Sequence, residues 1–77
     1  MSKKYLLLKL AEEAAEVAQA AIKHRLHGSD QTRVDLELEL GDLSALTALL
    51  MRDSHINPSR INAQTARRLD KEKNRNR

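Results

Sequence analysis

The sequence predicts an all-α protein with three helices in each chain, and three observations lead to this prediction. Leu and Ala dominate the apolar residues, whereas β-branched and aromatic residues are scarce and Tyr5 is the one aromatic among Phe, Trp and Tyr. Gly28, Gly41 and Pro58 are the only helix breakers, and they divide the chain into roughly three stretches. Within these stretches the apolar residues recur at helical spacing.

The first stretch predicts a helix from about Lys3 to His27. Basic residues near its end suit the negative C-terminus of a helix, and Gly28 supplies a left-handed cap. The three histidines, which lie near helix ends or in a loop, are interpreted as capping or surface residues rather than metal ligands: His24, His27 and His55.

The second helix is expected to begin at Ser29, Asp30 or Thr32, since each of these side chains can accept a hydrogen bond from a free backbone amide. Thr32 followed by Asp35 resembles a capping box with a shorter acid. Residues 34–40 alternate apolar and acidic side chains, as a half-buried strand would. We expect helix there, because the leucines continue at helical spacing to about Asp53 and no second strand is present to pair.

Asn57 followed by Pro58 predicts the start of a third helix, which runs to about Lys71. Its apolar stripe is thin, so it requires docking against another element. The predicted organisation is a single helical domain over residues 1–73 and a basic disordered tail over residues 74–77.

Composition excludes several classes of protein. The 77 residues are too few for separate cofactor and substrate domains. Without Cys there are no disulfides, thiolate zinc ligands or cysteine nucleophiles, so catalysis would use carboxylates, hydroxyls, His or a hard metal. No apolar run is long enough for a bilayer span or a signal-peptide core, so we expect a cytoplasmic protein with no membrane partner.

The net charge of +3 belongs to the end of the chain. Residues 1–65 carry eight Lys and Arg against nine Asp and Glu, whereas residues 66–77 carry six against two. The high isoelectric point therefore says little about the body of the protein.

Two acids of the second helix fall on its apolar face. A helical projection places Glu39 in the middle of the leucine stripe and Asp42 between two leucines, while Glu37 points to the opposite side. On the first helix, Glu13 lies at the edge of the polar strip that holds Glu16. Acids are rarely buried unless they are paired or bind a metal.

Each helix therefore presents two carboxylates about one turn apart. If the two pairs face one another, each like-charge contact at ~5 Å costs about 3 kcal/mol at an effective dielectric of ~20, against a total stability of ~5–15 kcal/mol for a domain. A divalent cation resolves the repulsion, and all-oxygen ligands favour Mg²⁺, with Mn²⁺ as the alternative. Mg²⁺ commonly shares its ligand shell with substrate phosphates, which suggests phosphate chemistry.

Glu12-Glu13-Ala14-Ala15-Glu16 followed by Glu39-Leu40-Gly41-Asp42 resembles the EExxE and ExxD motifs of the MazG-like all-α nucleoside triphosphate pyrophosphohydrolases. The similarity extends from Leu10 to about Lys71, and the length is that of minimal, phage-type members. The resemblance implies a Mg²⁺-dependent enzyme that hydrolyses (deoxy)nucleoside triphosphates to the monophosphate and pyrophosphate, with a role in nucleotide-pool house-cleaning.

The same resemblance implies roles for individual residues. The expected metal ligands are Glu13, Glu16, Glu39 and Asp42. The expected catalytic residues are Glu12 and Glu39, with Glu12 holding a second metal, acting as general base or remaining solvated. The expected substrate and phosphate contacts are Gln19, Lys23, Arg68 and Lys71, of which the last two belong to a basic C-terminal helix that closes over the triphosphate in the family.

The wide apolar surface of the first helix predicts an oligomer, because so short a chain cannot cover it. We expect a dimer that packs its first two helices as a four-helix bundle around the carboxylates, and the family resemblance adds the tetramer. Three other hypotheses stay open. They are hydrolysis of phosphoribosyl-ATP, a dimeric helical protein that binds nucleic acid through its basic C-terminal segment, and a structural helix pair whose acids pair with Arg.

Overall fold

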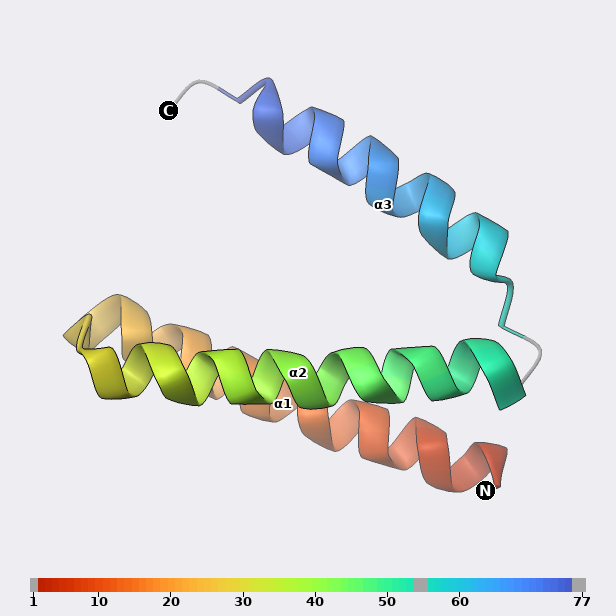
Figure 1. Ribbon diagram of the computed structural model, residues 1–77, viewed down its shortest axis with the longest axis horizontal. Coiled ribbons are helices and arrows are strands. Elements are labelled where there is room, and N and C mark those ends of the chain that lie inside the picture. The colour runs from red at the N-terminus through yellow and green to blue at the C-terminus, as the bar shows by residue number, and fades with distance from the viewer. Residues whose placement is uncertain (1, 54–55, 76–77) are drawn as a thin grey trace.

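The structure, a computed structural model, describes residues 2–53 and 56–75, which form three helices and no strand. These are α1 (Lys3–His27), α2 (Asp30–Asp53) and α3 (Pro58–Lys73), shown in Figure 1. The predicted all-α architecture with three helices is confirmed. The alternating segment 34–40 lies inside α2, and α3 extends to Lys73 rather than Lys71. His55 and the last two residues of the predicted tail lie outside the described residues.

The α1 helix has a cap at each end. The Ser2 hydroxyl accepts a hydrogen bond from the Tyr5 amide at 3.1 Å. At the other end Gly28 adopts φ +61°, and its amide donates to the His24 carbonyl at 2.8 Å. This left-handed conformation ends the helix where the sequence predicts, because glycine adopts it without the steric penalty of a Cβ atom.

Ser29 and Thr32 cap α2 reciprocally. The Ser29 hydroxyl accepts from the Thr32 amide, and the Thr32 hydroxyl accepts from the Ser29 amide, each at 3.1 Å. The capping box therefore joins Ser29 and Thr32 instead of Thr32 and Asp35, with threonine in the place usually held by Glu or Gln. At α3 the expected cap is present, since Asn57 Oδ1 accepts from the amides of Ser59 and Arg60 at 2.9 and 3.3 Å.

The α1 and α2 helices pack antiparallel along a seam that repeats every seven residues, as in a coiled coil. The half-buried or buried seam residues are Leu6, Leu10, Glu13, Val17, Ala20 and His24 on α1 and Thr32, Leu36, Glu39, Leu43, Leu46 and Leu50 on α2. A hydrogen bond of 2.9 Å between His24 Nδ1 and Thr32 Oγ1 fixes the register beside the turn. The same register sets Leu6 opposite Leu50, both buried, at the far end of the seam.

The α3 helix rises away from this pair and makes almost no contact with it (Figure 1). The radius of gyration is 14.6 Å, against ~11.5 Å for a compact domain of this length. Among the described helices, none is long and apolar enough to cross a membrane. The site-bearing unit is therefore the α1–α2 pair.

Candidate metal and phosphate site

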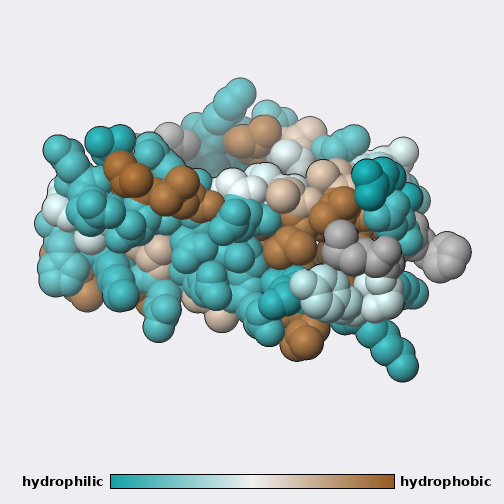
Figure 2. Space-filling view, turned by 60° about the horizontal axis from the view of Figure 1, so that its bottom comes forward, coloured by the Kyte–Doolittle hydropathy of each residue, from teal (hydrophilic) through white to brown (hydrophobic). Residues whose placement is uncertain are grey.

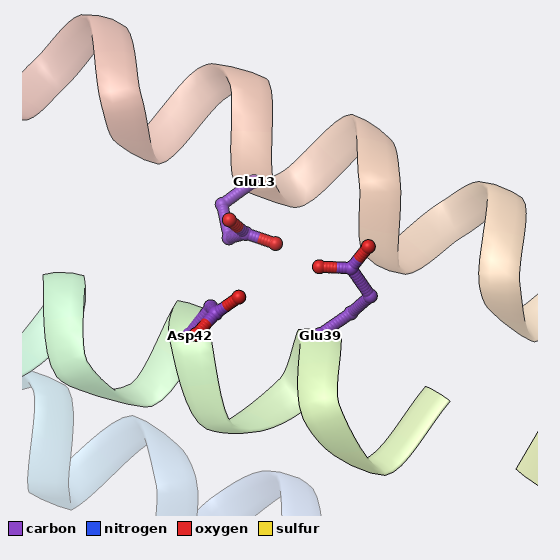
Figure 3. Close-up of side chains that lie close together, drawn as sticks. All are labelled: Glu13, Glu39 and Asp42. Atoms are coloured by element: carbon purple, nitrogen blue, oxygen red, sulfur yellow. The ribbon is translucent and has the colours of Figure 1, made fainter. Parts of the chain in front are cut away.

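Glu13, Glu39 and Asp42 converge between α1 and α2. Glu13 projects from α1 toward α2, and the other two project from successive turns of α2 toward α1 (Figure 3). Each offers one carboxylate oxygen, and these oxygens lie within 4.8 Å of one another. Glu13 and Glu39 are seam residues in neighbouring layers, whereas Asp42 lies at the exposed edge. The seven-residue repeat of the seam therefore places two acids where apolar side chains are usual.

One oxygen of Glu13 is buried without a partner. Glu13 Oε2 is shielded from solvent, and no donor within the described part of the chain reaches it. A hydrogen bond with Glu39, desolvation and the neighbouring carboxylates raise the pKa of Glu13 from 4.5 to about 7. Two carboxylates share a hydrogen bond only when one holds a proton, and the buried Oε2 of Glu13 has no hydrogen-bond partner among the described residues. A proton or a cation between the carboxylates of Glu13 and Glu39 would satisfy this oxygen.

The oxygen donors suit a hard divalent cation. Two ligands on opposite sides of an octahedral Mg²⁺ lie ~4.2 Å apart, because each Mg–O distance is ~2.1 Å. Adjacent ligands of the same octahedron lie only ~3.0 Å apart, so the three oxygens, which lie within 4.8 Å of one another, must draw closer together to share one ion. No Arg or Lys in residues 2–53 and 56–75 forms an ion pair with any member of this triad. The three acids are thus open to a cation.

A polar cavity of about 380 Å³ adjoins the triad. Its lining consists of Glu16, Gln19, Ala20, Lys23, Asp35, Leu38, Glu39 and Asp42. Glu39 and Asp42 belong to both the triad and the cavity, and Lys23 is the only cation in the lining. The predicted phosphate contacts Gln19 and Lys23 therefore lie beside the predicted metal ligands.

Two predicted residues of α1 lie apart from the triad. Glu16 is exposed and lines the cavity, but it is outside the group of oxygens that lie within 4.8 Å. Glu12 is exposed and pairs with Lys9 at 3.2 Å. The structure thus brings Glu16 to the site as a lining residue and leaves Glu12 on the neighbouring surface.

The predicted contacts on α3 are not brought to this site. Arg68 pairs with Glu72 at 2.6 Å and lines a separate groove along α3, and Lys71 is exposed. Because α3 makes almost no contact with the α1–α2 pair, neither residue approaches the carboxylates. A closing movement of α3 would be needed to bring them there.

Asp35 and Leu38 also line the cavity, whereas the sequence pattern predicts for Asp35 only a capping role and for Leu38 no role at the site. Asp35 Oδ1 accepts a hydrogen bond from Gln31 Nε2 at 2.8 Å. A signal was present, since Asp35 precedes Glu39 by four residues and therefore lies beside it on the helix surface.

Comparison with protein-family models, with curated proteins and with solved structures finds no significant match to this chain.

Proposed function

We propose that the protein is a Mg²⁺-dependent pyrophosphohydrolase of nucleoside triphosphates. One observation carries the proposal. Three carboxylates converge within 4.8 Å beside a cavity that contains a lysine, and one of their oxygens is buried without a donor. The resemblance of Glu12–Glu16 and Glu39–Asp42 to the MazG-like motifs points to the same chemistry.

Glu13, Glu39 and Asp42 would hold Mg²⁺, which supplies Lewis-acid stabilisation of phosphate charge and lowers the pKa of a bound water. Lys23 and Gln19 bind phosphate oxygens in the cavity, Lys23 as the positive charge and Gln19 as a hydrogen-bond donor. The acidic lining would repel a triphosphate by itself, so substrate and cation bind together.

In the hydrolysis, the oxygen of a water forms a bond to the α-phosphorus, the bond from this phosphorus to the α–β bridging oxygen breaks, and the nucleoside monophosphate and pyrophosphate are released. We assign Glu16 as the general base that accepts a proton from the attacking water, because its carboxylate lines the cavity and lies outside the triad of Glu13, Glu39 and Asp42. Glu12 is a weaker candidate, since Lys9 engages it on the surface. The general base must lie within hydrogen-bond reach of the water.

Incubation with a panel of ribonucleoside and deoxynucleoside triphosphates and Mg²⁺, followed by measurement of pyrophosphate, tests the proposal. Glu39→Gln is expected to lose activity by at least 100-fold, as is usual for removal of a charged group at a catalytic centre. Glu37→Gln is the matched control, because Glu37 is exposed and pairs with Arg33 at 3.3 Å. If no substrate releases pyrophosphate and both variants behave as wild type does, the proposed enzymatic activity is refuted. Phosphoribosyl-ATP, added to the same panel, tests the alternative substrate.

Nucleic-acid binding is a second candidate, which the separation of α3 favours. The described residues 56–75 carry six Lys and Arg against two Asp and Glu, and this helix makes almost no contact with the carboxylate site. Phosphate contacts of this kind weaken steeply with salt. A shift assay at two salt concentrations, with Arg67→Gln/Lys71→Gln as the comparison, distinguishes this function from hydrolysis.

A further inference from the structure

A groove runs along one side of α3, separate from the carboxylate site. Its volume is about 770 Å³, and all its lining residues belong to α3 or to the two residues before it. We name it the α3 groove. Two rows of side chains at four-residue spacing line it, a polar row of Arg60, Gln64 and Arg68 and a largely apolar row of Ile61, Thr65 and Leu69. The α3 groove therefore places cations beside an apolar surface.

The chain itself does not cover the apolar row. Leu69 is 57% exposed, and α3 makes almost no contact with the α1–α2 pair. The accessible surface of the chain is 6234 Å², whereas a compact monomer of 8.7 kDa exposes ~4,700 Å², and the separation of α3 accounts for the excess. A helix of 16 residues gains most of its stability from packing of its amphipathic face. The α3 groove therefore requires a partner surface.

Charge distinguishes the α3 groove from an ordinary apolar patch. Figure 2 shows hydrophobic side chains in separate patches among hydrophilic ones on one face of the molecule. The α3 groove instead joins its apolar row to basic side chains, and residues 56–75 carry six Lys and Arg against two Asp and Glu. Its one acid, Glu72, pairs with Arg68 and Arg75 at 2.6 and 2.9 Å. Arg60 forms no ion pair within the described part of the chain. The groove therefore complements an anionic partner.

Shape and length select a helix as that partner. A flat bilayer does not follow a groove, and nucleic-acid phosphates would engage the arginines but leave Ile61 and Leu69 in water. The lining spans residues 56–72, which is ~24 Å at 1.5 Å per residue. Arg60 and Arg68 lie ~12 Å apart along α3, so a helix in the groove reaches both with acids seven or eight residues apart.

We propose that the α3 groove binds an acidic amphipathic helix of another protein. The apolar side chains of that helix cover Ile61 and Leu69, and its acids pair with Arg60 and Arg68. The groove shares no lining residue with the cavity beside the carboxylates, so the metal and phosphate site stays open when the partner is bound. This inference does not depend on the proposed hydrolysis.

A synthetic peptide tests the groove. The probe is a fluorescent, alanine-based helix of ~16 residues, the length of the groove, with a leucine row beside a glutamate row, each at four-residue spacing. Its control carries lysine in place of glutamate. In a fluorescence-anisotropy titration, wild type should bind the glutamate peptide saturably and the lysine peptide at least tenfold more weakly.

Variants locate the binding on the groove. Arg60→Gln/Arg68→Gln should weaken binding of the glutamate peptide at least tenfold, and so should Leu69→Glu. The matched control, Lys71→Gln/Lys73→Gln, removes the same charge outside the groove and should change the affinity by less than about twofold. Circular dichroism checks that the variants remain helical. No saturable binding by wild type, or equal weakening by the two double variants, overturns the proposal. So does a failure of the peptide when a DNA duplex or anionic vesicles bind wild type and Leu69→Glu equally, which assigns α3 to a polyanion.

Hydrogen exchange gives a second readout that needs no variant. The amides of α3 should exchange rapidly in the free protein and become protected when the glutamate peptide is added, because few contacts hold this helix in the free chain. Protection of α3 without the peptide would show that the α1–α2 pair covers the groove itself, and it would overturn the proposal.

Discussion

Glu13 and Glu39 occupy neighbouring layers of the α1–α2 seam, each with a carboxylate oxygen within 4.8 Å of the other, and this proximity to Glu39 together with desolvation raises the pKa of Glu13 to about 7. The seam elsewhere is mostly aliphatic, so the helix pair accepts two acids where Leu or Val would pack. The cost is electrostatic, and a proton or a cation lowers it. The stability of the pair is thereby linked to pH and to divalent ions.

In metal-free buffer we expect the stability of the fold to fall as pH rises from about 4.5 to about 7. In this window folded Glu13, with its pKa raised to about 7, holds a proton that the unfolded chain has already released at its ordinary value of 4.5. The folded state therefore binds more protons, and stability falls with pH. Thermal unfolding in EDTA across this range measures the slope. Glu13→Gln should flatten it, and an unchanged slope in that variant would assign the effect to other groups.

Mg²⁺ is expected to raise the midpoint of thermal unfolding at pH 8. A ligand that binds only the folded state stabilises it by about 2.7 kcal/mol at 100 times its Kd. Asp42→Asn should lose this rise, whereas Glu37→Gln, on the opposite side of α2, should keep it. Scanning calorimetry with and without EDTA gives the comparison. If Mg²⁺ raises the unfolding midpoint equally in wild type and in both variants, the ion binds at another site.

Leu6→Ala should destabilise the chain by about 2–5 kcal/mol, the usual cost of removing a buried leucine side chain. Leu6 is fully buried, with 0% exposure, and packs at the end of the seam opposite Leu50. Leu69→Ala, at 57% exposure on α3, should cost less than 1 kcal/mol. Urea titration followed by circular dichroism separates the two, and similar losses would show that α3 is packed in solution.

Alanine substitution at the two glycines should change the stability of the fold in opposite directions. Gly28→Ala places a side chain at φ +61°, which costs about 1–2 kcal/mol even though the nearest atom to the new Cβ is the His24 carbonyl oxygen at 3.9 Å. Gly41→Ala should instead stabilise the fold by about 0.5–1 kcal/mol, because Gly41 is inside α2 and, apart from the adjacent backbone of that helix, no atom of the described residues lies within 4 Å of the added Cβ. Thermal unfolding of both variants measures the two changes in stability. A Gly28→Ala variant more stable than Gly41→Ala would contradict the prediction.

The bounds of the helices could be predicted because their signals are local. Gly28 and the pair Asn57–Pro58 act on adjacent backbone groups, so sequence alone identifies them. Sequence alone does not identify the Ser29–Thr32 cap, because three neighbouring residues offer acceptors and only the backbone conformation selects among them. Capping choice at this turn depends on the geometry of both residues.

The convergence of Glu13 with Glu39 and Asp42 could also be predicted, because helical periodicity sets all three on the faces that meet. The separation of Glu16 from the triad could not, since it depends on how far each helix is rotated about its axis. The position of α3 depends on tertiary packing, which the short apolar stripe of Ile61 and Leu69 leaves weakly specified.

The turn at Gly28 also sets how far apart in the sequence the residues of each seam layer lie. The packing between helices joins α1 to α2, and the separation grows from His24 and Thr32 beside the turn to Leu6 and Leu50 at the far end. Contacts between elements adjacent in the chain are typical of fast-folding proteins. We expect refolding to begin beside this turn and to be slowed where the acids meet half-way along, so divalent ions should speed it.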